Sequence, residues 1–110
     1  SAFIIDVGQV AISVYKESNK ANTTTTGELY NPEELTAAHA SIRLGQVVYV
    51  ENPVNGRGIY VRINDRTIEN VLQLSKQAYE LLGYSEPVLS SSIDGIAPPK
   101  TARIFTLEEI

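Results

Sequence analysis

Two runs of β-branched and aromatic residues, 47–50 and 59–63, flank a segment that contains Asn55-Gly56. The Asn-Gly step favours the positive φ angle of a tight turn, so the two runs are predicted to form a β-hairpin. Residues 7–15 alternate between apolar and polar side chains, which is typical of a half-buried strand, and residues 102–107 favour a last strand. Several short strands of this kind indicate a small β-barrel rather than a helical bundle or a βαβ sheet.

One helix is predicted over residues 74–82. Ser75 can cap its first turn, and Gly83 stands where a helix-ending glycine is expected. Its predicted apolar face consists of Ala78, Leu81 and Leu82. The other segments are predicted to be irregular: a polar loop over residues 16–27, a turn or single helical turn over 31–34, and a Ser-, Pro- and Gly-rich excursion over 85–100.

The length and composition exclude several classes of protein. A chain of 110 residues predicts a single domain over residues 1–110, and the absence of methionine suggests that Ser1 is a processed end. Without cysteine the chain has no disulfide, thiolate nucleophile or cysteine-bound metal. The net charge of −4, with Lys and Arg dispersed, disfavours a nucleic-acid binder. No apolar stretch approaches the ~20 residues of a membrane span.

Five short motifs then occur in order along the chain. They are Thr24 to Glu28, Leu35 to His39, Leu44 to Val50, Asn55 to Arg57 with Val61 to Arg66, and Leu74-Ser75 leading to Leu82-Gly83. Together they resemble the rare lipoprotein A-like double-psi β-barrel family, whose bacterial members include lytic transglycosylases of the cell wall. The resemblance extends from about residue 8 to residue 83 and resumes weakly in the last strand. It implies a mainly β fold, a six-stranded double-psi β-barrel with one or two short helices.

The same resemblance implies a function and a set of site residues. The expected activity is lytic cleavage of peptidoglycan glycan strands, with Asp65 as acid/base and Glu28 and His39 in support. Such an enzyme needs one acid/base and neither metal nor cofactor, because the C6 hydroxyl of the sugar attacks and closes an anhydro ring. Peptidoglycan as the partner implies export to the bacterial cell envelope.

We expect particular surroundings for these groups. Strand alternation predicts that Arg62 and Asn64 point away from Asp65, which leaves Arg66 as the adjacent cation. If Glu28 lies across the groove from Asp65, mutual repulsion would raise the pKa of one of the two carboxyls. His39 is expected to hydrogen-bond Asp65 or a substrate oxygen.

Four residues are candidates for substrate binding: Tyr15 and Tyr30 as sugar-stacking rings, with Asn64 and Arg66. Other interpretations of the site residues remain open. Asp65 could be a turn former or an arginine partner, and the tyrosines could simply pack. The threonines at 23–26 are interpreted as a flexible or edge segment without chemistry. A metal site formed by His39, Glu28 and Asp65 lacks the close ligand spacing of such sites.

Three departures from the family pattern leave alternative functions open. Thr67-Ile68 replaces Gly-Pro, and Gln73 and Asn31 each replace an aspartate. An altered groove rim favours a non-catalytic module that binds cell-wall glycan or a protein. A third alternative is a structural or inhibitory role, in which segment 85–101 makes a protein contact.

Overall fold

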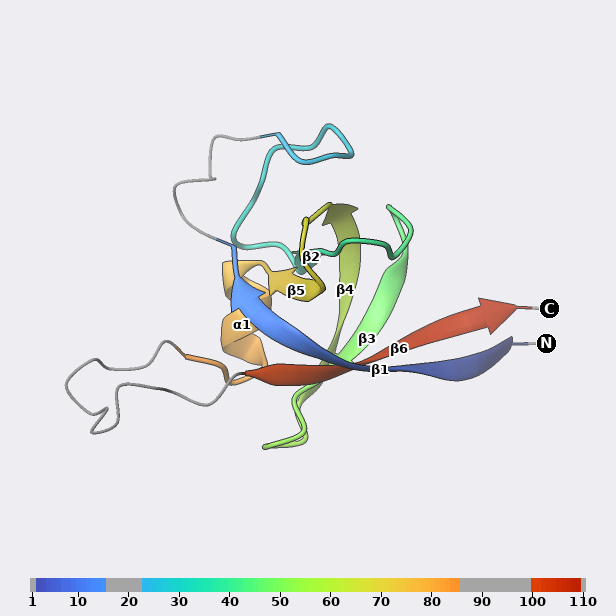
Figure 1. Ribbon diagram of the computed structural model, residues 1–110. Coiled ribbons are helices and arrows are strands. Elements are labelled where there is room, and N and C mark those ends of the chain that lie inside the picture. Colours follow the sequence, from blue (N-terminus) through green and yellow to red (C-terminus); the bar gives the residue numbers. More distant parts are fainter. Residues whose placement is uncertain (1, 16–22, 86–99, 110) are drawn as a thin grey trace.

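The computed structural model describes residues 2–15, 23–85 and 100–109, and within them six strands close into a barrel with one short helix packed against its outside (Figure 1). The order around the barrel is β1-β5-β2-β4-β3-β6. This confirms the predicted mainly β, six-stranded barrel, and it is consistent with a double-psi topology. The elements are β1 (Ala2–Val14), β2 (Thr36–Ala38), β3 (Val47–Glu51), β4 (Gly58–Asp65), β5 (Val71–Leu74), α1 (Lys76–Leu81) and β6 (Thr101–Glu109).

The barrel mixes parallel and antiparallel neighbours. β1 pairs parallel with β5 and antiparallel with β6, while β2 pairs parallel with β4 and antiparallel with β5. Strands that are distant in sequence therefore lie side by side. Residues 16–22 of the loop predicted over 16–27, and residues 86–99 of the excursion predicted over 85–100, lie outside the described residues.

The predicted hairpin is present and is tied to the helix. β3 and β4 pair antiparallel with Tyr49 opposite Tyr60, and Gly56 in the connecting turn has φ 75°. The side-chain amides of Asn52 and Asn55 donate hydrogen bonds to the carbonyl of Leu82 at 2.9 and 3.0 Å. The turn thus satisfies a carbonyl that the end of the helix leaves unpaired.

The helix is shorter than predicted. Ser75 caps it by accepting a hydrogen bond from the backbone N–H of Ala78 at 3.3 Å, and Gly83 follows with φ 85°. Leu74, predicted to be helical, ends β5. The prediction that Leu81 belongs to the apolar face is wrong, because 43% of Leu81 is exposed whereas Tyr79 is buried. A helix of six residues presents only one narrow stripe to the barrel.

The core lies inside the barrel and under α1. Each of its larger aliphatic side chains stabilises the fold by about 1.5–3 kcal/mol on burial. β1 contributes Val10 and Ile12 by alternation, as its sequence pattern predicts. The most completely buried aliphatic side chains are Val48, Val50, Val61, Ile63, Leu72, Leu74, Leu82 and Ile104.

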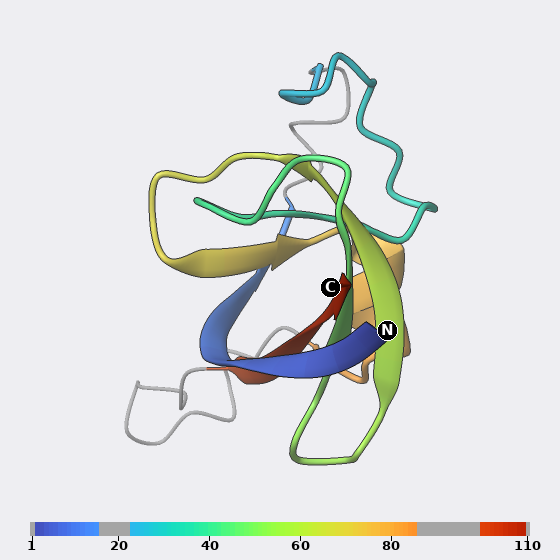
Figure 2. The same ribbon diagram turned by 90° about the vertical axis from the view of Figure 1, so that its right-hand side faces the viewer.

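β1 and β6 continue beyond the barrel as a two-stranded extension, here called the arm, which comprises residues 2–6 and 105–109 (Figures 1 and 2). A register shift between Asp6 and Gly8 marks its base. β1 therefore begins five residues earlier than the predicted start at residue 7. Residues 2–5 lack alternation because much of this segment is solvent-exposed, with Ile4 73% exposed.

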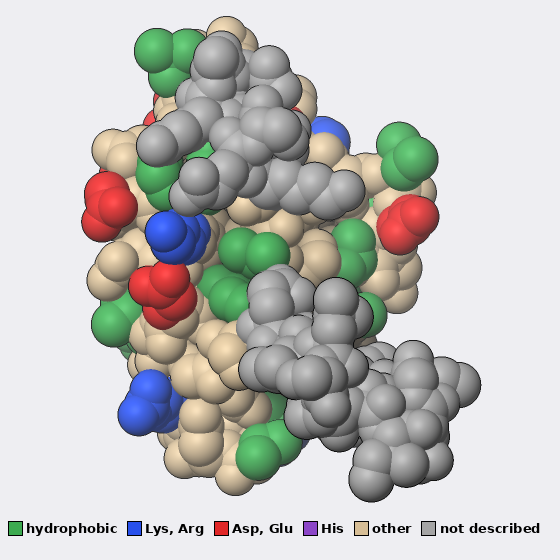
Figure 3. All heavy atoms as spheres, turned by 90° about the vertical axis from the view of Figure 1, so that its left-hand side faces the viewer, with side chains coloured by type: hydrophobic (Ala, Val, Ile, Leu, Met, Phe, Trp, Pro, Cys, Tyr) green, Lys and Arg blue, Asp and Glu red, His purple; other side chains and the backbone are tan. Residues whose placement is uncertain are grey.

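The surface shows no gathering of basic groups on the face seen in Figure 3, where the visible Lys and Arg side chains are separated by other types. In the described part of the chain, no helix has the length and apolar character needed to cross a membrane.

Candidate active site

Asp65 is the last residue of β4, and a bulge sets its direction. Opposite β4, the register of β2 shifts so that Ala37 pairs with Ile63 and Ala38 pairs with Asp65, which leaves Asn64 as an extra residue. Asn64 is buried next to buried Ile63, whereas Asp65 is partly exposed. Strict alternation through Arg62–Asp65 was therefore a wrong prediction, because a bulge re-aims the side chains that follow it.

Four hydrogen-bond donors hold the carboxylate of Asp65. Oδ1 accepts from the backbone N–H of Thr25 at 3.0 Å, from Oγ1 of Thr25 at 2.6 Å and from the backbone N–H of Arg66 at 2.9 Å. Oδ2 accepts from the Tyr15 hydroxyl at 2.7 Å. Among the described residues Asp65 makes no ion pair, so the interpretation of Asp65 as an arginine partner is not supported.

These contacts keep Asp65 ionised and Tyr15 protonated. Burial raises the pKa of Asp65 more than any single hydrogen bond lowers it, but the bonds from Thr25, Tyr15 and Arg66 together bring that pKa below its ordinary value. Burial, followed by the bond to Asp65, raises the pKa of Tyr15 to about 12. At neutral pH the pair is therefore a carboxylate beside a neutral phenol.

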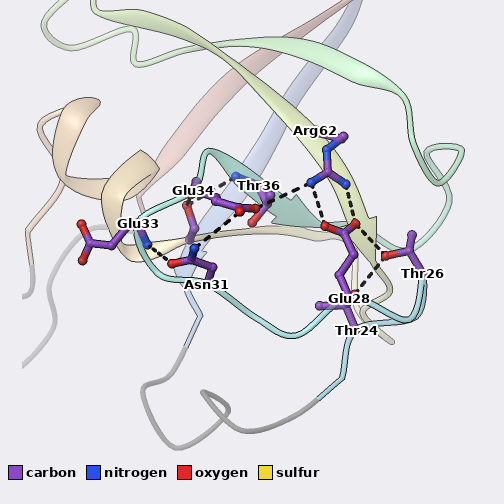
Figure 4. A network of polar contacts seen from close by, with 9 residues as sticks. Thr24, Thr26, Glu28, Asn31, Glu33, Glu34, Thr36 and Arg62 are labelled. Carbon is purple, nitrogen blue, oxygen red and sulfur yellow. Dashed lines mark hydrogen bonds and ion pairs between the residues drawn. The ribbon is translucent and has the colours of Figure 1, made fainter.

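Glu28 is held by an arginine. The guanidinium of Arg62 forks onto both oxygens of Glu28, at 2.5 and 2.8 Å, and reaches Glu34 at 3.8 Å (Figure 4). Oγ1 of Thr26 also donates to Glu28 at 2.9 Å. The Arg62 bond, followed by the Thr26 bond, lowers the pKa of Glu28. The expected rise in the pKa of one of the two carboxyls by mutual repulsion is absent, because both pKa values are lowered.

His39 lies beside Asp65 through the backbone, where its N–H donates to the carbonyl of Asp65 at 3.2 Å. Its imidazole Nδ1 accepts the backbone N–H groups of Ser41 and Ile42 at 3.1 and 3.2 Å. Burial, helped by the nearby Arg66 charge, lowers the pKa of His39, so the ring is neutral. With Nδ1 accepting, the ring proton resides on Nε2. The imidazole is thus oriented by its own loop rather than by the carboxylate of Asp65.

Arg66 does not place its charge on Asp65. Its guanidinium donates to the carbonyls of His39, at 3.3 Å, and Ile42. Only its backbone N–H contacts the Asp65 carboxylate. The expectation that the Arg66 cation is the neighbour of this carboxylate was therefore wrong, and Arg66 instead fastens the His39 loop to the end of β4.

Tyr15 and Tyr30 stack on one another, with ring centroids 4.3 Å apart and planes at 27°. Tyr30 is only 6% exposed and its hydroxyl accepts the backbone N–H of Lys76 at 3.1 Å. Little of the Tyr30 ring is open to a sugar, which favours the packing interpretation for this residue. Tyr15 is partly exposed and touches Asp65, so it stays a candidate for substrate contact.

Thr25 and Thr26 are functional candidates that the sequence pattern did not indicate. Both lie inside the motif Thr24 to Glu28, and that position was the one available signal. The turn is built by hydrogen bonds from Gly27 N–H to the carbonyl of Thr24 at 2.9 Å and from Thr26 N–H to the carbonyl of Asn64 at 3.2 Å. One short turn therefore binds both Asp65, through Thr25, and Glu28, through Thr26.

The described residues contain no group of three or more His, Asp or Glu side chains arranged to hold a metal ion. The donor set instead consists of two ionised carboxylates, a neutral imidazole and a neutral phenol. Carboxyl and imidazole groups of this kind can transfer protons and donate hydrogen bonds to a polar substrate.

Comparison with known proteins identifies the family. Residues 8–100 match the family model described as lytic transglycolase, so this chain belongs to the rare lipoprotein A-like lytic transglycosylase family. It is 45% identical over 76 residues to the endolytic peptidoglycan transglycosylase RlpA of Yersinia pestis, an alignment that covers 66% of this chain and 21% of the relative.

Two further relatives bear related names. The probable endolytic peptidoglycan transglycosylase RlpA of Nostoc is 51% identical over 63 residues, which cover 54% of this chain and 17% of that protein. RlpA of Pseudomonas aeruginosa is 36% identical over 90 residues, which cover 78% of this chain and 26% of that protein. The chain thus spans about a sixth to a quarter of the length of these relatives.

Proposed function

We propose that this chain is a peptidoglycan lytic transglycosylase domain in which Asp65 is the acid/base. The observation that carries the proposal is the state of Asp65, which sits at a strand end without an ion-pair partner among the described residues and is oriented by four hydrogen bonds. Of the two carboxylate oxygens, Oδ2 accepts a single hydrogen bond, from the Tyr15 hydroxyl.

The distribution of donors indicates which oxygen transfers the proton. Oδ1 takes three donors and Oδ2 takes one, and a carboxylate oxygen has about two lone-pair positions. Oδ2 therefore retains a position for a proton or for a substrate hydroxyl. Tyr15 and Thr25 act as positioning residues for Asp65, because they fix the orientation of the carboxylate.

The reaction then needs no water. Protonated Oδ2 gives its proton to the glycosidic oxygen as the C1–O bond breaks, and oxocarbenium-like charge develops at the sugar. The C6 hydroxyl of the same sugar bonds to C1 and returns its proton to Asp65. The products are a free hydroxyl on one chain end and a 1,6-anhydro ring on the other, and the carboxyl is regenerated.

Glu28 and His39 have supporting roles. Oε2 of Glu28, which accepts one hydrogen bond from Arg62, accepts a second from a sugar hydroxyl. Nε2–H of His39 donates to a substrate oxygen, because Nδ1 is already committed to the loop. Peptidoglycan as the substrate places this activity in the bacterial envelope, and the chain is proposed to be exported.

The lowered pKa of Asp65 also sets a requirement. The free carboxyl is ionised at neutral pH, so the acid form must be produced when substrate covers it. Further burial raises a carboxyl pKa, and burial is already the largest single influence on Asp65. The rate of cleavage should therefore increase as the pH falls. The increase should end where Glu28 becomes protonated and the fold loses stability.

A glycan-binding module without turnover is the second candidate function. The observation that favours it is that no neighbouring carboxylate raises the pKa of Asp65, since Glu28 is neutralised by Arg62. The Thr67, Gln73 and Asn31 replacements at the rim point the same way.

Digestion of purified peptidoglycan, with and without stem peptides, separates the two functions. The parent chain and its Asp65→Asn variant are compared, and the products are identified by mass spectrometry. Anhydro-sugar ends from the parent alone establish the lytic reaction and the role of Asp65. Absence of soluble product from both, together with retention on the same glycan in a pull-down, would refute the catalytic proposal in favour of the binding module.

A further inference from the structure

A second surface, unconnected with the proposed reaction, lies where the arm leaves the barrel. The ladder between β3 and β6 ends at the pair Tyr49 and Phe105, although β3 begins two residues earlier and β6 runs on to Glu109. Beyond that pair the two strands diverge (Figures 1 and 2). The space between them is a cleft of about 580 Å³, here called the fork cleft.

The fork cleft is apolar and open. Ile4 and Leu107 of the arm form one wall and are 73% and 63% exposed, and Val47 and Tyr60 of the barrel form the other at 50% and 67%. Tyr49 and Phe105 form the base, with ring centroids 6.2 Å apart. A contiguous group of exposed apolar side chains on a soluble protein marks an interaction surface more often than chance exposure.

The cleft also exposes strand edges. Thr106 and Leu107 pair with β1 on one side, and within the described residues they have no strand partner on the side facing the cleft. Val47 and Val48 pair with β4 only. An unpaired edge of this kind can accept an extended segment as an added strand, whose main chain supplies affinity while alternate side chains fill the apolar wall.

The charges around the cleft determine which extended segments are electrostatically complementary to it. Glu51 lines the cleft and makes no ion pair among the described residues. Its cross-strand neighbour Arg103 is engaged by Asp6 at 2.5 Å. Among the described residues that line the cleft, Glu51 is therefore a carboxylate that no cation compensates. A basic occupant is complementary to it, whereas the arm of a second copy would bring further carboxylates.

We propose that the fork cleft binds an extended polypeptide segment of a partner protein in which apolar and basic side chains alternate. The segment adds to the edge of β6 beyond Phe105. Its apolar side chains pack between Leu107 and Tyr60, and a basic side chain pairs with Glu51.

The test uses two end-blocked hexapeptides, one alternating Lys and Val and the other alternating Glu and Val. Each is titrated at low ionic strength into the isotope-labelled chain, and the backbone amide resonances are followed by NMR. We expect saturable shifts with the Lys-Val peptide at Val47, Tyr49, Thr106 and Leu107, and none with the Glu-Val peptide.

Variants give the matched controls. Glu51→Gln should weaken binding of the Lys-Val peptide by about 2- to 5-fold, the range for a rim ion pair. Leu107→Ser should weaken it further, whereas Val54→Ser, at a still more exposed apolar position (91%) away from the cleft, should not change it.

Three outcomes would overturn the proposal: equal binding of the two peptides, shifts confined to residues outside the cleft, or no binding. Sedimentation of the chain without peptide tests the other possible occupant, which is a second copy of the chain. Concentration-dependent dimers that Leu107→Ser abolishes would show that a second copy fills the cleft instead. None of these outcomes depends on turnover of peptidoglycan, so the test stands whether or not the proposed reaction is correct.

Discussion

The end of the barrel around Asp65 and the fork cleft differ in how many of their groups already have partners within the chain. Around Asp65 nearly every polar group already has a partner: Thr25, Tyr15 and Arg66 hold one carboxylate, and Arg62 holds the other. In the described part of the fork cleft, the edge of β6 beyond Phe105 has no strand partner on the cleft side and Glu51 has no ion-pair partner. Several apolar side chains there are exposed to solvent. The side chains of the first region are preorganised by hydrogen bonds within the chain. The second region has an open strand edge that only an added strand would pair.

The largest expected effect separates the two regions by activity. Asp65→Asn should lower peptidoglycan cleavage by about 10²- to 10⁴-fold, the usual contribution of a general acid/base. Leu107→Ser in the fork cleft should leave the rate unchanged. Release of anhydro-muropeptides, quantified over time, is the measurement. Equal rates for parent and Asp65→Asn would remove Asp65 from the mechanism.

Breaking the Arg62 fork should have a smaller effect on activity. Arg62→Gln removes both bonds to Glu28, so the pKa of Glu28 should rise toward its ordinary value and cleavage should fall on the order of tenfold, about the loss of one charge-assisted bond. Arg103→Gln is the matched control, because it breaks the ion pair with Asp6 at the base of the arm. The Glu28 pKa is measured by NMR of its labelled carboxyl. An unchanged rate in Arg62→Gln would make the fork purely structural.

Lowering the pH should reduce the stability of the fold in two separate pH ranges. The pKa values of Asp6, Glu28 and Asp65 are lowered by their hydrogen bonds, so the stability they contribute is present above the unfolded pKa near 4 and is lost as pH falls through their folded values. The pKa of buried His39 is also lowered, so stability should begin to fall as pH drops below about 6.5, where the unfolded histidine gains a proton.

Thermal unfolding between pH 7 and pH 3 checks this prediction. In His39→Gln the loss near pH 6 should disappear while the loss below pH 4 remains. A parent chain whose melting temperature is flat from pH 7 to pH 5 would contradict the His39 part.

The smallest expected effect concerns Thr25. Thr25→Val deletes one hydroxyl donor to Oδ1 of Asp65 and keeps the backbone donor, so the Asp65 pKa should rise. The rise should be small, since Thr25 is exposed and its bond is partly screened. Thr25→Ser should restore the parent value. The Asp65 pKa is read by NMR, independently of cleavage, and a pH–rate profile that follows it would assign Thr25 as a positioning residue. Identical titrations in all three proteins would exclude that role.

The sequence predicted the fold better than it predicted the surroundings of the site. Alternation and turn chemistry are local, so the hairpin, the cap at Ser75 and Gly83 were predicted correctly. The boundary at Leu74 and the exposure of Leu81 depend on how α1 docks against the barrel, which no local pattern contains.

In the site, the motifs indicated Asp65, Glu28 and His39, and their catalytic roles stay predictions. Their partners were not predictable. The Arg62 fork joins two residues, Arg62 and Glu28, that are 34 positions apart in the sequence. Thr25 and Asp65 are 40 positions apart. The extra residue at Asn64 also reverses the alternation from which the surroundings of Asp65 had been deduced.

The position of β1 has a consequence for how the chain folds. Both of its neighbours come late in the sequence, since β5 begins at Val71 and β6 at Thr101, and the outermost β1–β6 pair joins Ala2 to Glu109. Contact order is therefore high, and closing such long loops slows folding. On the ribosome, the apolar face of β1 stays unpaired until β5 and β6 have been made. During that interval β1 is open to aggregation.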